Sequence, residues 1–262
     1  MSRILVSAAV VLVAAVAVPS VADGATLYQD GHASHRILLQ DESGKTNLVS
    51  VEGSRSVVIH DANAPISVDH VPGCMPVDAR TVSCSATVRR RVELDLGDGP
   101  DVATVATPRP VEIEGGNGPD RYVSLAQDWP SRVDFDGGIG VDVANYFFAT
   151  AGVEVSMDLE AGDGRPGDDD LIRRDVETVV GSQHADMLTG SPYTTRLAGN
   201  DGDDQITGGS GQELLSGGDG QDRVDARDGS PDTVDCGGQL FDWAAVDLTG
   251  EASIAGCAQI VS

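Results

Sequence analysis

Aromatic and basic residues are both scarce in this chain. Of its 262 residues, 4% are Phe, Trp or Tyr. The chain contains 17 Lys and Arg but 42 Asp and Glu, which gives a formal net charge of −25. So few rings argue against a stacking platform for bases or sugars, and a polyanion repels nucleic acid and anionic lipid. We expect no nucleic-acid partner, and we expect cations or basic surfaces instead. At 40% hydrophobic residues, the chain can still bury a core.

Long apolar runs are absent beyond the N-terminus. There, Ile4 to Val18 form an apolar run of about 15 residues, shorter than the roughly 20 that a membrane-spanning helix needs. Arg3 before this run and the small residues Ser20 and Ala22 after it are typical of a secretory signal peptide over residues 1–22. We therefore expect no membrane span and a secreted, extracellular protein.

Cysteines are few, and they do not show the spacing of a zinc site. The four are Cys74, Cys84, Cys236 and Cys257, with no CxxC pair and no nearby group of histidines. Four cysteines allow three pairings. The chain positions favour two local disulfides, Cys74–Cys84 and Cys236–Cys257, which suit an oxidising compartment.

Two common catalytic motifs are also missing. The five histidines form no HExxH, and there is no GxSxG. Paired acids occur throughout the chain, so they carry no catalytic information, and we expect a protein that is not an enzyme.

Glycine and aspartate, by contrast, are abundant and periodic. From Gly181 the chain divides into rows of nine: GSQHADMLT, GSPYTTRLA, GNDGDDQIT, GGSGQELLS and GGDGQDRVD, followed by ARDGSPDTVD with one insertion. Glycine begins five rows in succession. The eighth place is always apolar, with Leu188, Leu197, Ile206, Leu215 and Val224, and Val234 continues the series. A fixed period of this kind predicts a repeat architecture rather than a flexible linker.

These rows resemble the GGxGxDxUx nonapeptide of RTX (hemolysin-type) calcium-binding proteins. Residues 217–225 match every position, whereas Asn200 and Glu213 depart from the pattern and Thr195 replaces the acid. The resemblance implies a parallel β-roll in which six residues form a turn and three form a strand. It also implies that calcium binds between stacked turns.

Glycine turns with a looser spacing precede the regular rows. They lie at 96–104, 115–123, 137–145 and 161–172, and each follows a short alternating segment. We expect the inward residues of these segments to be Leu94, Ile113, Phe135 and Met157. The predicted fold is therefore all-β, a parallel β-roll or β-helix solenoid with irregular β caps at both ends.

The repeats divide the chain into regions. Residues 92–235 form the predicted calcium-binding solenoid, with regular nonapeptides over 181–235. Residues 26–91 are either an N-terminal β cap or irregular first coils, and the sequence does not choose between these. Residues 236–262 are predicted to form a disulfide-closed C-terminal cap, with Phe241 and Trp243 filling the open end of the core.

The turn acids are predicted to stack. One continuous ladder on one edge would hold Asp101, Asp120, Asp142, Asp168 or a neighbour, Asp186, Asp204, Asp222 and Asp242. A shorter ladder on the opposite edge would hold Glu213 and Asp232.

The predicted cofactor is Ca²⁺. Adjacent strands lie about 4.8 Å apart and calcium–oxygen bonds measure 2.3–2.6 Å, so one ion can join acids of successive coils. Magnesium requires a stricter octahedron, and zinc prefers His or Cys. The candidate ligands are Asp101, Asp120, Asp142, Asp186, Asn200, Asp201, Asp204, Glu213, Asp219, Asp222 and Asp232.

Two functions remain open. The first is a small, secreted, non-catalytic rod that folds with calcium and acts as a structural or adhesion module, with an extracellular surface or matrix polymer as a partner. The alternative is a calcium-dependent β-helix enzyme that acts on acidic polysaccharide.

Overall fold

The computed structural model describes residues 25–28, 36–41, 44–69, 71–85, 91–127, 129–247 and 253–262. The predicted signal peptide, residues 1–22, lies outside the described residues. The described chain is all-β, and its parallel coils stack into a solenoid of about eight turns, which confirms the predicted fold class. Among these residues there is no apolar helix of a length that would cross a membrane.

Three sheets build the solenoid. In spatial order, sheet A contains β5 (Ile66–Asp69), β1 (Ala25–Tyr28), β2 (Arg36–Gln40), β8 (Arg91–Asp95), β10 (Val111–Asn117), β12 (Val133–Ile139) and β15 (Leu171–Ile172). Sheet B contains β6 (Cys74–Asp78), β7 (Thr81–Cys84), β4 (Val57–Asp61), β3 (Leu48–Glu52), β9 (Val102–Ala106), β11 (Arg121–Ser124), β13 (Val143–Asn145), β16 (Thr178–Val180), β18 (Arg196–Asp201), β20 (Leu214–Asp219), β22 (Thr233–Asp235) and β24 (Ser253–Ala255). Sheet C contains β14 (Glu154–Val155), β17 (Met187–Thr189), β19 (Gln205–Thr207), β21 (Arg223–Asp225), β23 (Trp243–Ala245) and β25 (Gln259–Val261).

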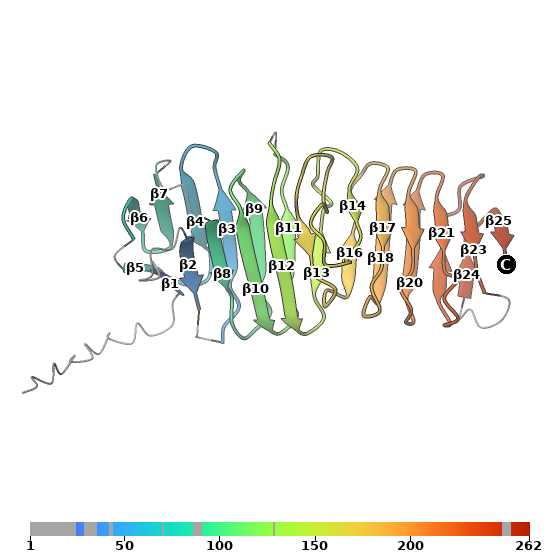
Figure 1. The fold of residues 1–262 in the computed structure, drawn as a ribbon, viewed down its shortest axis with the longest axis horizontal. Helices are drawn as coiled ribbons and strands as arrows, with labels where there is room; N and C mark the ends of the chain where they lie inside the picture. The colour runs from blue at the N-terminus through green and yellow to red at the C-terminus, as the bar shows by residue number, and fades with distance from the viewer. Residues whose placement is uncertain are drawn as a thin grey trace, which may run out of the picture.

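From β8 onward, each coil contains one strand of sheet B and one strand of sheet A or C, except that β14 of sheet C and β15 of sheet A both lie between β13 and β16. The chain alternates A and B from β8 to β13 and alternates B and C from β16 to β25. Sheet B therefore runs along the whole rod, and sheets A and C lie opposite its N-terminal and C-terminal parts (Figure 1). Since the chain reverses direction between sheets, turns into sheet B and turns out of it lie on opposite edges of the rod.

The apolar eighth place of each nonapeptide lies inside the rod, as predicted. Leu188, Ile206 and Val224 are in register on β17, β19 and β21, and each is at most 1% exposed. Leu197, Leu215 and Val234 form the matching row on sheet B and are fully buried. Alternation along these strands thus places the eighth residue of each nonapeptide in the core.

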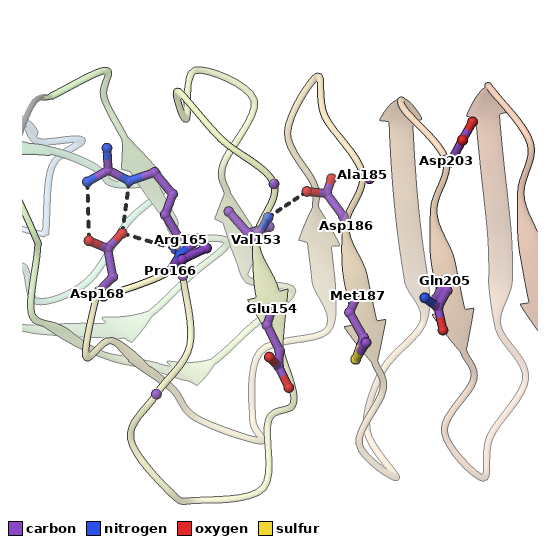
Figure 2. A pocket seen from close by; sticks show the side chains of 14 residues that line it. Val153, Glu154, Arg165, Pro166, Asp168, Ala185, Asp186, Met187, Asp203 and Gln205 are labelled. Carbon is purple, nitrogen blue, oxygen red and sulfur yellow. Dashed lines mark hydrogen bonds and ion pairs between the residues drawn. The ribbon is translucent and has the colours of Figure 1, made fainter.

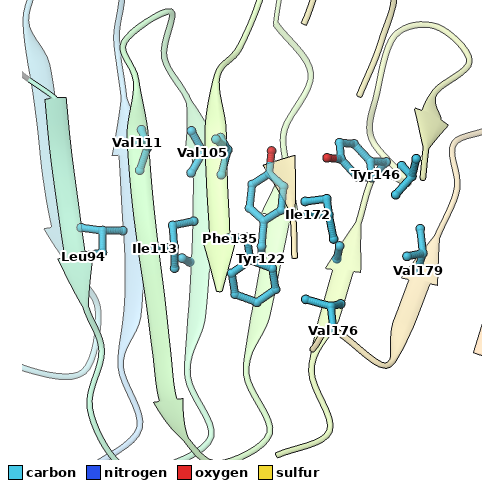
Figure 3. Close-up of a cluster of buried hydrophobic side chains, with 14 of the residues drawn as sticks. Leu94, Val105, Val111, Ile113, Tyr122, Phe135, Tyr146, Ile172, Val176 and Val179 are labelled. Carbon is cyan, nitrogen blue, oxygen red and sulfur yellow. The ribbon is translucent and has the colours of Figure 1, made fainter. Parts of the chain in front are cut away.

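The looser upstream coils enclose a larger core. Leu94, Ile113 and Phe135 lie in register on β8, β10 and β12 and are buried, as predicted (Figure 3). From the sheet B side, the ring of Tyr122 on β11 meets edge-on the ring of Tyr146, which directly follows β13, with centroids 5.7 Å apart. Met157 is also buried, as predicted, but β14 ends at Val155, so the alternating segment predicted before the turn at 161–172 is not a strand at Met157.

The N-terminal region combines both open alternatives. β2 and β3 pair in parallel with β8 and β9, so they form a first coil. β4, β7 and β6 then extend sheet B with antiparallel pairing, and β1 pairs antiparallel with β2. The predicted Cys74–Cys84 disulfide joins β6 to β7.

At the C-terminal end, β23, β24 and β25 continue the same parallel pairing as the coils before them. The predicted Cys236–Cys257 disulfide is present. However, Phe241 is 64% exposed, and Trp243 lies in register with Arg223 on the outer face, where the guanidinium carbon is 4.1 Å from the ring centroid. The prediction that these two aromatics fill the core is therefore wrong, because Ala244 takes the inward place of β23.

Glycine is required where turns of successive coils touch. Gly116 has a φ of 102°, and a Cβ there would clash with the carbonyl of Gly97 in the preceding coil. Gly167 has a similar φ of 96°, but no atom lies within 4 Å of its Cβ position. Alanine substitutions at Gly116 and Gly167 can therefore be compared. Both would place a side chain on a residue with positive φ, but only the one at Gly116 would clash with the neighbouring coil.

We expect Gly116→Ala to lower the free energy of unfolding by about 1–3 kcal/mol more than Gly167→Ala, because both add backbone strain but only one adds a backbone clash. Urea unfolding in saturating calcium measures the difference. Equal losses in the two variants would show that the coils do not stack this closely.

Candidate metal centre

Acids that directly precede the strands of sheet B line one edge of the rod in two hydrogen-bonded segments, which together we term the B column. The backbone N–H of Asp101 donates to Oδ1 of Asp120 at 2.8 Å, and the N–H of Asp120 donates to Oδ1 of Asp142 at 2.7 Å. The N–H of Asp142 in turn donates to Oε2 of Glu177 at 2.7 Å. Each carboxylate thus accepts a backbone hydrogen bond from the coil before it.

The B column extends beyond these four acids in both directions along the rod. At its start, the N–H of Asn47 donates to Oδ1 of Asp101 at 2.5 Å. Thr195, which precedes β18, interrupts the acids. The column then resumes with Glu213, whose N–H donates to Oδ1 of Asp232 at 2.9 Å.

A second column, the C column, precedes the strands of sheet C. The backbone N–H of Asp186 donates to Oδ1 of Asp204 at 2.8 Å. In the same way, the N–H of Asp204 donates to Oδ1 of Asp222 at 3.0 Å, and the N–H of Asp222 donates to Oδ1 of Asp242 at 3.2 Å. Asp186 also accepts the N–H of Val153 at 2.7 Å. The C column therefore extends from β14 to β23.

The predicted single ladder is wrong between Asp142 and Asp186, where it placed Asp168 or a neighbour. Turns 115–120 and 137–142 lead from sheet A into sheet B, whereas turn 181–186 leads from sheet B into sheet C. Asp101, Asp120 and Asp142 therefore share a column with Glu213 and Asp232 and lie on the edge opposite Asp186. Asp168 belongs to neither column, because it pairs with Arg165 at 3.0 Å and accepts the N–H of Ser131.

The column acids are buried, and several retain an oxygen with no hydrogen-bond partner. Exposure is 3% or less for every acid of the two columns named above except the half-buried Glu177. The second carboxylate oxygen is buried without a partner in Asp101, Asp120, Asp142, Asp204, Glu213 and Asp222. A buried anionic oxygen without a donor is costly.

The first glycine of each turn makes room for these oxygens. A Cβ on Gly115 would lie 2.7 Å from Oδ2 of Asp120, and a Cβ on Gly199 or Gly217 would clash with Asp204 or Asp222. None of these three glycines has a positive φ. Glycine is needed there because the carboxylate of the sixth position folds back over the first.

Burial raises the pKa of carboxyl groups in both columns. Desolvation raises the pKa of Asp101, Asp142 and Asp204 to about 7 and that of Asp222 to about 6, and neighbouring carboxylates add to the shift. Desolvation likewise raises the pKa of Glu213 to about 7, with a further contribution from the carboxyl of Asp232. At neutral pH these sites therefore favour either a proton or a cation.

Three acids at the C-terminal part of the B column converge. Glu213, Asp228 and Asp232 each place one carboxylate oxygen within 4.8 Å of the others. Two oxygens on one calcium ion lie at most about 5 Å apart, since each bond is 2.3–2.6 Å long. Glu213 and Asp232 were predicted ligands, and the structure brings Asp228 to them.

The other predicted ligands lie in the turns rather than in the columns. Asp201 and Asp219 pair in register at the ends of β18 and β20, and both are exposed. Asn200 has a φ of 82° and donates from its side chain to the carbonyl of Gly181 at 2.9 Å. Asn200 thus takes the place of a glycine, and its amide also links two coils.

Sequence reasoning missed Asn47, Glu177 and Asp228. Glu177 directly precedes an apolar strand, as the sixth-position acids do, but it follows no glycine turn. Asp228 precedes Gly229 as Asp201 and Asp219 precede Gly202 and Gly220. These two sequence features could have identified Glu177 and Asp228, whereas no feature of the neighbouring sequence identifies Asn47.

A cavity of about 420 Å³ lies where sheet C begins. Glu154, Arg165, Asp168, Asp186 and Asp203 are among its lining residues (Figure 2). Among the residues that the structure describes, Arg165 is the one basic lining residue, and its guanidinium already bonds Asp168, the Thr150 hydroxyl and the carbonyls of residues 127 and 129. The cavity therefore offers an acidic surface but no uncommitted base.

The residues of the two columns fit a hard cation. Their available atoms are carboxylate oxygens, and the unpartnered buried ones supply the negative charge that such an ion would neutralise. No model of a protein family and no curated protein matches this chain.

In chelator, we expect the thermal unfolding midpoint to fall as pH rises from 5 to 8. A carboxyl whose pKa is raised by folding contributes stability fully below its ordinary pKa near 4, and that stability is lost as pH rises through 6–7. Calorimetry across this pH range measures the trend. A midpoint that rises with pH would contradict the burial of these acids.

Proposed function

We propose that the two acid columns bind Ca²⁺ and that the solenoid is ordered by these ions. The observation that carries the proposal is the set of buried carboxylate oxygens without hydrogen-bond partners, repeated along both edges of the rod. The residues that would hold ions first are Asp204 with Asp222, Asp186 with Asp204, and Glu213 with Asp228 and Asp232. Asp101, Asp120 and Asp142 would extend the sites upstream, with Asp201 and Asp219 close to the turns.

Calcium suits these sites better than other common ions. It accepts six to eight oxygen ligands in flexible geometry, whereas magnesium keeps a rigid octahedron and most of its water. Neither column contains histidine or cysteine, the ligands that zinc prefers. The resemblance of residues 181–235 to RTX nonapeptides supports the same ion.

Repulsion between coils links the ions to folding. Two carboxylates about 5 Å apart repel each other by roughly 3 kcal/mol at an effective dielectric of 20. Several such steps approach the whole stability of a domain, about 5–15 kcal/mol. An ion that binds only the stacked coils would therefore stabilise the fold by binding.

We further propose a secreted, non-catalytic role as a rigid structural or adhesion module. The leader-like residues 1–22 and the two disulfides support an extracellular location. The commitment of Arg165 to internal partners leaves the 420 Å³ cavity without a free base for sugar chemistry. This favours a binding or structural protein over the polysaccharide enzyme.

At pH 7.5 in chelator, we expect the chain to lose most of its β-sheet signal, and millimolar calcium to restore it where equal magnesium does not. Far-UV circular dichroism reads the transition, and isothermal calorimetry gives the number of ions. The same spectrum with chelator and with calcium, together with no heat of binding, would overturn the proposal.

Asp204→Asn tests the carboxylate itself. The amide oxygen can still accept the N–H of Asp186, so we expect this variant to be more stable than the wild type in chelator at pH 7.5, where the buried charge is removed. In calcium it should be less stable, with a calcium midpoint raised about tenfold, which corresponds to about 1.4 kcal/mol.

Glu52→Gln is the matched control for charge, because Glu52 is exposed and far along the chain from these turns. It should change neither measurement. Destabilisation of Asp204→Asn in both calcium and chelator would indicate that Asp204 has only a structural role.

A further inference from the structure

The C-terminal end of the rod has no charged side chain on its last two strands. β24 and β25 are the outermost strands of sheets B and C, and among the described residues no strand pairs with their free sides (Figure 1). Residues 253–262 contain no Asp, Glu, Lys or Arg in a chain with a net charge of −25. Open strand edges are usually protected by charge, proline or a bulge.

The apolar core reaches the surface at this end. Val224, Ala244 and Ile260 are in register, and exposure changes from 0% for the first two to 53% for Ile260. Beside them, the turn before β23 exposes Leu240 by 83% and Phe241 by 64%. The end of the rod therefore combines free strand edges with an apolar surface.

At the opposite end, the outermost strand of sheet B is β6, and it is protected in two ways. β6 contains Pro76, which has no N–H to donate, and the pairing of β6 with β7 shifts register between Pro76 and Asp78. A head-to-tail contact would need this protected edge, whereas a tail-to-tail contact would not.

We propose that two copies of this chain join tail to tail through β24 and β25. A two-fold axis perpendicular to the sheets would place β24 antiparallel to its copy and β25 antiparallel to its copy at the same time. Such an isologous contact closes at two copies. It would also bury the exposed Ile260 and Phe241 of both chains.

Charge supports the choice of a second copy at this end. Two rods of net charge −25 repel each other along their acidic edges, and this repulsion is weakest at the end where residues 253–262 carry no charged side chain. The end of one coil covers less than the roughly 800 Å² per partner of a standard interface. We therefore expect a weak dimer, with a dissociation constant of about 0.1 mM.

Sedimentation equilibrium and small-angle X-ray scattering of the full chain in calcium, from about 0.01 to 1 mM, test the proposal. We expect conversion from monomer to dimer and a maximum dimension nearly twice that of the monomer. Circular dichroism of the same samples shows whether the rod is ordered, so a failure of calcium-dependent folding is distinguished from a failure to dimerise.

Variants locate the contact. Ile260→Asp and Phe241→Asp should each weaken the dimer at least tenfold, and both sites are already more than half exposed, so folding should persist. Met75→Asp is the matched control at the other end, where Met75 is 70% exposed on β6. A wild type that stays monomeric at 1 mM, a dimer weakened by Met75→Asp, or a dimer without the doubled length would each overturn the proposal.

Discussion

The structure depends on a carboxylate that accepts a backbone N–H from the neighbouring coil. One oxygen of Asp204 accepts the amide of Asp186, and the other remains buried without a donor. The first interaction sets the register between coils, and the second leaves negative charge inside the stack. Repeated along the rod, the same contact both aligns the coils and drives them apart. We therefore propose that neutralisation of the second oxygen by a proton or a cation decides whether the stack is stable.

Most other features of the repeat follow from this contact. The first glycine of a turn is small because the sixth-position acid folds over it, as Asp222 does over Gly217. Gly116 and Gly218 need positive φ and no Cβ because the carbonyl of the preceding coil lies against them. The inward-facing apolar residue of each strand, such as Val224, anchors the turn to the core. Flexible and acidic residues thus gather in one sequence motif for a geometric reason.

The sequence predicted what repeats locally and missed what depends on distant partners. The nine-residue period identified the buried row from Leu188 to Val234, because alternation alone decides which side of a strand faces inward. The step from Asp142 to Glu177 was missed, because Glu177 lies 35 residues further on, follows no glycine turn, and is marked only by its place before an apolar strand. Residues 161–170 also look like another calcium turn. In the fold, however, Arg165 neutralises Asp168, and Asp170 accepts hydrogen bonds from Ser131 and Tyr146.

The most direct test of the account is a crystal structure of the chain grown in calcium, with anomalous diffraction to locate the ions. The account predicts anomalous peaks on both edges of the rod, beside Asp204 and Asp222 on one edge and beside Glu213, Asp228 and Asp232 on the other. Ordered coils whose buried carboxylates contact only water or protein donors would contradict it.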